Sequence, residues 1–205
     1  MAEFAQPLRE VDVDRDPLRQ FAGWFAQAAA AGVRAPEAAA LATATADGLP
    51  SVRIVLVKQA NADGFVFYSN YTSRKGSELA SNPHAALVFY WDPLGRQVRV
   101  EGRVERTSAA ESADYVRSRP RASQLSALAS PQSAVIEGRG QLEARVGELA
   151  ARYECAELPL PDSWGGYRLL PQTFEFWQHR EDRLHDRLRY TRGRDGRWQL
   201  GRLAP

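Results

Sequence analysis

Two Asp-Gly pairs divide the first third of the chain into short apolar runs. Asp47-Gly48 follows residues 38–45, and Asp63-Gly64 follows residues 52–58. Asp-Gly is a strong signal for the tight turn of a β-hairpin, because glycine accepts the positive φ that such a turn requires. Short apolar runs bounded by turns of this kind indicate strands. The spacing therefore predicts an antiparallel hairpin early in the fold.

The second run ends in a segment with a cation on each side, Arg-Ile-Val-Leu-Val-Lys at residues 53–58. Its apolar residues predict a buried strand, because valine and isoleucine favour a pleated surface. Lys58 and Lys75 are the only lysines in the chain. An ammonium is a compact point charge, unlike the planar guanidinium of arginine, so a retained lysine favours a specific role. The alternative is an ordinary solvated lysine on the surface.

The rest of the pattern predicts more strands and several helices. Capping residues and periodicity predict helices over residues 17–31, 74–82, 108–117 and 140–154. Short apolar or alternating runs predict further strands over residues 64–68, 85–91, 97–105, 164–170, 173–179, 188–192 and 198–203. Polar residues alternate with valines over 97–105, as in an antiparallel sheet with one polar face. We therefore expect a mainly β protein with peripheral helices, one antiparallel barrel domain over residues 1–205, in which residues 1–16 form a flexible arm.

Composition places the chain among ordinary globular proteins, with 205 residues, 44% of them apolar and 25% charged. A formal charge of +2 does not favour a nucleic acid or a membrane as partner. Cys155 is the only cysteine, which excludes an internal disulfide and favours a reducing compartment. The first 16 residues lack the apolar core of a signal peptide, and no apolar stretch is long enough for a transmembrane helix. We expect a cytoplasmic protein.

Two clusters of cations and hydroxyls are candidate anion sites. Ser73 is a predicted helix cap followed by Arg74 and Lys75. Cations oppose the dipole at that helix end, unless an anion binds to the free N–H groups there. Tyr115, Arg119 and Ser123 form the second cluster, in which we expect the first two to share one helical face. Exposed basic side chains on surface helices are the alternative in both cases.

The chain offers few other groups for chemistry. His185, in the stretch from Arg183 to Arg187, titrates near neutral pH, whereas we interpret His84 and His179 as structural. No spacing of histidines, cysteines or carboxylates is typical of a metal site. The sequence also lacks the nucleophile elbow, the phosphate-binding loop and the dinucleotide fingerprint.

Eight segments, taken together and in order, resemble the bacterial pyridoxine/pyridoxamine 5′-phosphate oxidases, flavoenzymes of the FMN-binding split-barrel fold. The segments are RIVLVK (53–58), FVFYSN (65–70), SRKGSEL (73–79), RQVRVEGRVER (96–106), SRPRASQ (118–124), SPQS (130–133), PLPDSWGGYRL (159–169) and FWQ with RLHDR (176–187). The resemblance runs from about residue 38 to the C-terminal Leu-Ala-Pro.

The resemblance implies a Greek-key split barrel and a homodimer with FMN at the subunit interface. Implied FMN contacts are Arg53, Ile54, Val55, Leu56, Val57, Lys58, Tyr68, Ser69, Arg74, Lys75, Gln97, Gln132, Ser133, Trp177 and Arg187. Implied substrate contacts are Lys58, Tyr115, Arg119, Ser123, Arg183, Leu184 and His185, of which Arg183 and His185 are the candidate catalytic residues. The two anion sites thus acquire separate ligands, FMN at Arg74-Lys75 and substrate at Tyr115, Arg119 and Ser123.

The implied reaction oxidises pyridoxine 5′-phosphate or pyridoxamine 5′-phosphate to pyridoxal 5′-phosphate. A hydride passes from substrate C4′ to the flavin, and O2 reoxidises the flavin and gives H2O2; the amine substrate also releases ammonia. The flavin performs the redox chemistry, and the protein supplies binding and orientation.

Two departures from the family leave alternatives open. The chain lacks the Arg-Arg-Glu-Tyr arm that precedes the matching region in longer members, and residues 178–182 lack the glycines often found there. A shortened N-terminus resembles the related flavin oxidases of phenazine biosynthesis, which act on unphosphorylated aromatic compounds. A third possibility is a non-catalytic protein that binds flavin or pyridoxal phosphate. The complete substrate set, including Tyr115, Arg119 and Ser123, favours the phosphate-vitamer oxidase.

Overall fold

The computed structural model describes residues 7–205 of the chain. Its strands are β1 (Ala38–Ala44), β2 (Pro50–Asn61), β3 (Gly64–Asn70), β4 (His84–Trp91), β5 (Arg96–Arg106), β6 (Trp164–Gln178), β7 (Asp186–Arg192) and β8 (Trp198–Arg202). Its α-helices are α1 (Pro17–Ala30), α2 (Arg74–Ser81), α3 (Ala109–Ser118), α4 (Arg121–Ala129) and α5 (Arg139–Arg152), and short 3-10 turns lie at Asp92–Leu94 and Glu181–Arg183.

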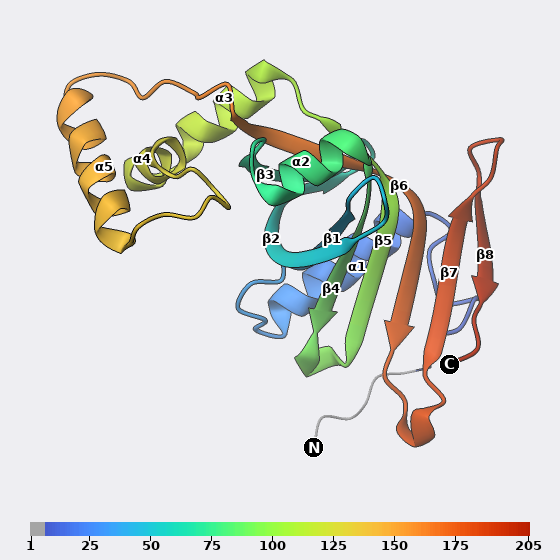
Figure 1. Ribbon diagram of the computed structural model, residues 1–205. Helices are drawn as coiled ribbons and strands as arrows, with labels where there is room; N and C mark the ends of the chain where they lie inside the picture. Colours follow the sequence, from blue (N-terminus) through green and yellow to red (C-terminus); the bar gives the residue numbers. More distant parts are fainter. Residues whose placement is uncertain (1–6) are drawn as a thin grey trace.

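The strands form one antiparallel sheet in the order β3-β2-β1-β4-β5-β6-β7-β8, and β3 also pairs with β6. This additional pairing closes the first six strands of that order into a barrel, while β7 and β8 extend the sheet beyond it (Figure 1). β4 lies beside β1, although β2 and β3 intervene in the chain, which is Greek-key order. The predicted hairpin, the antiparallel split barrel and the α+β class are confirmed.

Helix α1 supplies the aromatic residues that pack with the barrel strands in the core. Asp16 caps it by accepting a hydrogen bond from the Leu18 N–H at 2.9 Å, and Pro17 occupies its first position, as expected. The Phe21 ring lies 5.0 Å from the rings of both Phe65 and Phe89, in edge contacts. Such contacts fix the helix against the sheet because aromatic rings bury large apolar areas.

The expected flexible arm over residues 1–16 falls partly outside the described residues. Residues 7–16 contact the outer strands of the sheet. The N–H of Leu8 donates to Asp186 at 3.1 Å, and Arg202 donates to the carbonyl of Leu8 at 2.8 Å. Arg202 also forms an ion pair with Glu10 at 2.9 Å. This segment is therefore tied to β7 and β8.

Strand β2 is not the buried strand that its apolar run predicted. Val52 and Ile54 are each 68% exposed and Leu56 is 45% exposed, whereas Val57 is 6% exposed. A continuous apolar run is typical of a strand covered on both faces, but here one face has no cover within residues 7–205. The uncovered row of Val52, Ile54 and Leu56 borders the cavity described below.

The structure differs from the sequence-based expectations at two further places, each beside a proline. The strands expected at 164–170 and 173–179 are one strand, β6, in which the register shifts beside Pro171. Proline is tolerated in a sheet at such a bulge, because no ladder N–H is needed there. Helix α4 was not predicted, since its short alanine- and serine-rich sequence has only a weak apolar periodicity. Pro120 precedes its first residue and is its N-cap.

Helices α3, α4 and α5 project to one side of the barrel, opposite the edge formed by β7 and β8 (Figure 1). A small apolar cluster between α4 and α5 contains Leu125, Ala129 and Leu149. Across residues 7–205, no helix has the length and apolar character needed to cross a membrane.

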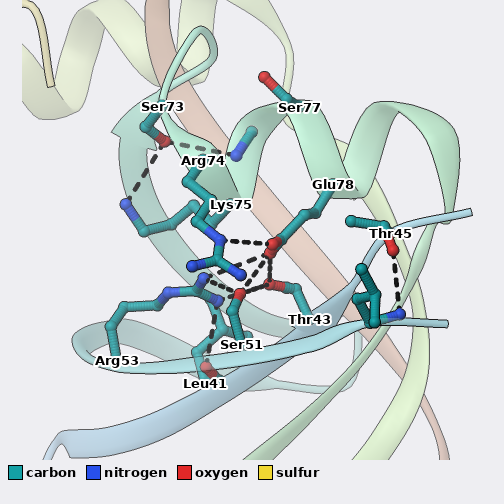
Figure 2. A network of polar contacts seen from close by, with 12 residues as sticks. Leu41, Thr43, Thr45, Ser51, Arg53, Ser73, Arg74, Lys75, Ser77 and Glu78 are labelled. Carbon is teal, nitrogen blue, oxygen red and sulfur yellow. Dashed lines mark hydrogen bonds and ion pairs between the residues drawn. The ribbon is translucent and has the colours of Figure 1, made fainter. Parts of the chain in front are cut away.

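A buried carboxylate joins helix α2 to the hairpin of β1 and β2 (Figure 2). Glu78 is 3% exposed and accepts hydrogen bonds from Ser51 at 2.6 Å, Arg74 at 2.9 Å and Arg53 at 3.3 Å, and also from Thr43. Burial by itself raises the pKa of Glu78, but the hydrogen bonds from Ser51, Thr43, Arg74 and Arg53 outweigh it and lower the pKa to about 2.

We expect Glu78→Gln to destabilise the protein at pH 7 by roughly 1–3 kcal/mol, because two guanidinium groups lose their shared carboxylate. The folded-state pKa of Glu78 lies below its usual 4.5, so its contribution is complete above pH 4.5 and is lost as the pH falls towards about 2. The difference in urea unfolding free energy between wild type and Glu78→Gln should therefore shrink across that interval.

Glu143→Gln is the matched control, because Glu143 is exposed and its ion pair with Arg139 lies on the surface of α5. That variant should stay within about 0.5 kcal/mol of wild type at all pH values. A gap for Glu78→Gln that stays constant down to pH 2 would contradict the assignment of the network.

Candidate active site

One large cavity lies among β2, β3, α2, α3, α4 and the segment that follows α4. Its volume is about 730 Å³, within the range of roughly 300–1,000 Å³ typical of small-molecule sites. It gathers most of the residues that the sequence singled out: Arg53, Ile54, Val55, Leu56, Lys58, Tyr68, Ser69, Arg74, Lys75, Tyr115, Arg119, Ser123, Gln132 and Ser133. We call these fourteen the pocket group.

Lys75 lines this cavity from the first turn of α2. Its side chain is mostly enclosed, with the residue 8% exposed, and its ammonium donates to Ser69 Oγ and Gln132 Oε1, both at 3.0 Å. Burial lowers the pKa of Lys75, and the charge of Arg53 acts in the same direction, while the charge of Glu78 opposes them. Within residues 7–205 no carboxylate forms an ion pair with Lys75. A buried ammonium bonded only to neutral groups is suited to an anionic ligand.

The N-terminus of α2 adds to this positive potential. Ser73 caps the helix and accepts a hydrogen bond from the N–H of Gly76 at 3.3 Å. Arg74 uses its Nε on Glu78, which leaves its terminal amino groups available at the cavity. Helix N-termini attract anions because their first N–H groups lack partners inside the helix. The buried Glu78 therefore orients Arg53 and Arg74 beside a cavity whose charged lining residues are all cations.

The segment after α4 brings Gln132 and Ser133 to the cavity. Ser69 Oγ donates to Gln132 Oε1 at 2.9 Å, which ties this segment to β3. Ser133 has a φ of 74°, a left-handed conformation that is uncommon for residues other than glycine. Such outliers persist where the surrounding contacts over-determine the backbone, and they concentrate at ligand sites.

The second anion cluster forms between two helices, and our expectation for its local structure was wrong. Helix α3 ends at Ser118, and Arg119 is extended, with φ −83° and ψ 151°. Tyr115 and Arg119 therefore do not share a helical face. Pro120 disfavours a helical conformation at the residue before it and starts α4, whose first turn contains Ser123. The three side chains nevertheless line the same cavity.

Stacked aromatic rings form the wall beside this cluster. The rings of Tyr68 and Tyr115 are nearly parallel, with centroids 3.6 Å apart, and the Trp164 ring lies 6.2 Å from Tyr115 with an interplanar angle of 4°. Burial, more than nearby charge, raises the pKa of Tyr68 to about 12, so it remains a neutral phenol.

Sequence reasoning did not identify several residues that line the cavity. Trp164, Asn70, Ser51, Ser126 and Ser130 belong to it as well. Asn70 and Trp164 are opposite each other in the β3–β6 ladder, although they are far apart in the chain. No local signal points to this pairing. Only the closure of the barrel brings Trp164 to the cavity.

The remaining predicted residues do not line this cavity. Val57 faces the hydrophobic core from β2. Gln97, Trp177 and Arg187 lie in one row across β5, β6 and β7, since Gln97 pairs with Trp177 and Trp177 pairs with Arg187. Arg183, Leu184 and His185 follow β6 in the chain. We call six residues the C-terminal group, because all but Gln97 of β5 lie near the end of the chain: Gln97, Trp177, Arg183, Leu184, His185 and Arg187.

Several contacts hold the C-terminal group in place. Arg187 donates through Nε to the buried Glu175 at 2.8 Å, and this hydrogen bond raises the pKa of Arg187 above its ordinary value. The His185 ring lies 4.6 Å from the Trp177 ring. His185 Nδ1 accepts a hydrogen bond from the N–H of Arg180 at 3.1 Å, so a neutral His185 carries its proton on Nε2. Arg183 has a φ of 60°, and Leu184 is 71% exposed.

Comparison with known proteins yields a consistent family. Residues 25–153 match the family model described as pyridoxamine 5′-phosphate oxidase, and residues 164–205 match the one described as the pyridoxine 5′-phosphate oxidase C-terminal dimerisation region. The pyridoxine/pyridoxamine 5′-phosphate oxidase of Burkholderia vietnamiensis (strain G4 / LMG 22486) is 54% identical over 200 residues, covering 97% of this chain and 93% of that relative. The protein of the same name from Trichormus variabilis is 52% identical over 200 residues, covering 98% and 94%.

Solved structures agree on the fold. The crystal structure of PhzG from Burkholderia lata 383, in complex with tetrahydrophenazine-1-carboxylic acid, superposes with a TM-score of 0.93 at 35% identity and covers all of both chains. A pyridoxamine 5′-phosphate oxidase-related, FMN binding protein from Nostoc punctiforme PCC 73102 has a TM-score of 0.72 at 19% identity, covering 93% of this chain and 98% of that one. By the extent and identity of these matches, the chain belongs to the pyridoxine/pyridoxamine 5′-phosphate oxidase family.

Proposed function

We propose that the protein is an FMN-dependent oxidase that converts pyridoxine 5′-phosphate or pyridoxamine 5′-phosphate to pyridoxal 5′-phosphate. The reaction consumes O2 and releases H2O2, and the amine substrate also releases ammonia. One observation carries the proposal: a single cavity is lined by Arg74 and Lys75 from α2 and, from other elements, by Arg119 with the hydroxyls of Tyr115 and Ser123. A cofactor and a substrate that each carry a phosphate require two such sites.

The cluster around Lys75 suits the phosphate of FMN. Lys75 is buried with only neutral hydrogen-bond partners, and the α2 N-terminus and Arg74 lie beside it. A phosphate there would supply the missing negative charge and accept hydrogen bonds from charged donors. Arg53, Ser69, Gln132 and the β2 backbone line the adjoining part of the cavity. When bound, FMN supplies the acceptor for the substrate's electrons and their subsequent transfer to O2.

The cluster around Arg119 suits the phosphate of the substrate. A guanidinium matches phosphate geometry through two parallel hydrogen bonds, and the hydroxyls of Tyr115 and Ser123 add donors. Ser123 also lies in the first turn of α4, where helix N–H groups favour an anion. Fixing the phosphate at a remote point restricts where the reacting carbon lies, which contributes through orientation. Lys58, paired with Glu37 at 3.8 Å, lines the cavity as a further cation for the substrate.

The C-terminal group completes the proposed site if two copies of the chain associate. Val52, Ile54 and Leu56 form an exposed apolar row beside the cavity, and such a patch is typical of an interaction surface. The C-terminal region matches a family model described as a dimerisation region. We propose a homodimer with FMN at the interface, in which the C-terminal group of one subunit faces the pocket group of the other. His185 and Arg183 would then contact polar groups of the substrate.

An oxidase of an unphosphorylated aromatic compound is the second candidate. It is favoured by the full-length superposition on PhzG, which is in complex with a phenazine derivative. Such a substrate has no phosphate for Tyr115, Arg119 and Ser123 to bind. A non-catalytic carrier of flavin or pyridoxal phosphate would bind the same ligands without producing peroxide.

We expect the purified protein to be yellow, to release FMN on denaturation, and to produce H2O2 from pyridoxine 5′-phosphate and pyridoxamine 5′-phosphate. Unphosphorylated pyridoxine and a dihydrophenazine carboxylate serve as comparison substrates in the same peroxide assay. Selective turnover of the dihydrophenazine would support the second candidate, and flavin binding without peroxide would support a carrier. A colourless protein that FMN cannot reconstitute would refute the flavoenzyme assignment.

Arg119→Ala and Lys75→Ala should separate the two phosphate sites. Each substitution removes a charged donor, which is worth roughly a 10- to 100-fold change in affinity. Arg119→Ala should raise KM for pyridoxine 5′-phosphate by that factor while FMN remains bound, whereas Lys75→Ala should weaken FMN binding. Steady-state kinetics and flavin fluorescence measure the two effects. Loss of FMN from Arg119→Ala would mean that the sites are assigned in the wrong order.

Mixed dimers test whether two subunits build each site. We expect Arg119→Ala and Arg183→Ala homodimers to be impaired, but their mixed dimer to recover about half of the wild-type activity, because one of its two sites is intact. Mixing Arg119→Ala with Ser123→Ala is the control, since both belong to the pocket group and neither site is restored. Equal activities of the two mixtures would argue against a shared site.

A further inference from the structure

Arg119 lacks the polar partners that usually hold an arginine in place. Its guanidinium takes part in no hydrogen bond or ion pair anywhere in residues 7–205. Instead, its Cζ lies 5.6 Å from the ring centroid of Trp164 and 5.9 Å from that of Tyr115. Both distances fall within the range of about 6 Å over which a cation is attracted to an aromatic face. The aromatic wall is therefore what orients this side chain.

We propose that Trp164 is a positioning residue that holds Arg119 ready for the substrate phosphate and so favours phosphorylated over unphosphorylated substrates. This inference rests on the proposed function, in which Arg119 binds that phosphate. It adds a residue that touches neither the phosphate nor the flavin in our assignment. Trp164 acts through Arg119.

The chemistry of the contact explains why rings suit this task better than a carboxylate. A guanidinium carries its five N–H donors in its own plane. An acidic partner would use some of these donors and cancel the positive charge, so the phosphate would have to displace it. An aromatic face attracts the cation without accepting its N–H groups in that plane. Arg119 is thus restrained while its donors remain available for two parallel bonds to a phosphate.

Trp164 is itself fixed well enough to act as a support. Its residue is 8% exposed, and it pairs with Asn70 at the start of the β3–β6 ladder. Its backbone N–H donates to the carbonyl of Pro161 at 2.9 Å. Its ring lies 5.7 Å from that of Tyr68 at an interplanar angle of 12°. A ring held by a strand terminus and by a stack has little freedom to move, so it can restrict the guanidinium beside it.

Trp164→Leu and Trp164→Phe test the inference in the FMN-loaded enzyme. Leucine keeps apolar bulk but removes the aromatic face, whereas phenylalanine keeps a face. For Trp164→Leu we expect KM for pyridoxine 5′-phosphate to rise about tenfold, with kcat within about twofold of wild type. KM for unphosphorylated pyridoxine should not change. Trp164→Phe should restore most of the wild-type KM.

Trp198→Leu is the matched control, because Arg192 lies over the Trp198 ring at 5.8 Å in a comparable contact on the outer strands. It should leave both KM values unchanged. Flavin content and circular dichroism melting confirm that each variant is folded and loaded. An equal rise in KM for both substrates, an unchanged KM for the phosphorylated one, or no rescue by Trp164→Phe would overturn the inference.

Direct binding separates failure of this inference from failure of the proposed function. If wild type does not oxidise pyridoxine 5′-phosphate, the proposed function fails, and calorimetric titration with pyridoxal 5′-phosphate still measures the phosphate site. Trp164→Leu should then weaken that binding about tenfold, and Trp164→Phe should not. Equal affinities of wild type and Trp164→Leu, or no binding to wild type, would overturn the role of Trp164.

Discussion

The pairing of β3 with β6 is the constraint on which the rest of the structure depends. It closes the barrel, and its register places Tyr68 opposite Gly166 and Asn70 opposite Trp164. The cavity wall is assembled from these strand ends. The same strand β6 continues to Trp177, where it pairs with Arg187 and begins the C-terminal group. One long strand therefore contributes to both groups of candidate site residues.

The charged residues that line the cavity are all cations. Lys58, Arg53, Arg74, Lys75 and Arg119 line it. The buried carboxylate of Glu78 contacts Arg53 and Arg74, whereas within residues 7–205 the ammonium of Lys75 donates only to neutral groups and the guanidinium of Arg119 contacts only aromatic rings. An excess of positive charge inside a partly enclosed site attracts anions strongly, because the low local dielectric weakens screening. Arg53 and Arg74 are therefore held by a carboxylate, whereas no carboxylate within residues 7–205 occupies the side chains of Lys75 and Arg119, which suits these two to anionic ligands.

Local chemistry made several elements predictable from the sequence. Asp16 with Pro17, and Ser73 before Arg74, indicate helix starts that the structure confirms. The predictions failed where tertiary context overrides local signals. The two strands expected over 164–170 and 173–179 are one strand with a bulge at Pro171, and Pro120, two residues after the end of α3, is the N-cap of α4. The apolar run of β2 indicated burial that residues 7–205 do not provide.

The candidate site was predictable only in part, for similar reasons. The resemblance named twenty-one residues, and the structure brings fourteen of them to one cavity. It could not name Trp164, whose place depends on strand register across the barrel and on the conformation of Arg119. Trp164 stands in one of the eight matching segments, but that match assigns no role to its side chain. The role proposed for it rests on distances and ring orientations across the barrel.

The central claim is that the cavity holds two phosphate-bearing ligands at once, one at Lys75 and one at Arg119. Titration of the FMN-loaded protein with pyridoxal 5′-phosphate, with simultaneous measurement of free flavin, tests it most directly. Our account predicts one pyridoxal 5′-phosphate bound at the cavity for each flavin, with no release of FMN. Displacement of FMN by pyridoxal 5′-phosphate in proportion to its binding would show a single shared phosphate site and contradict the account.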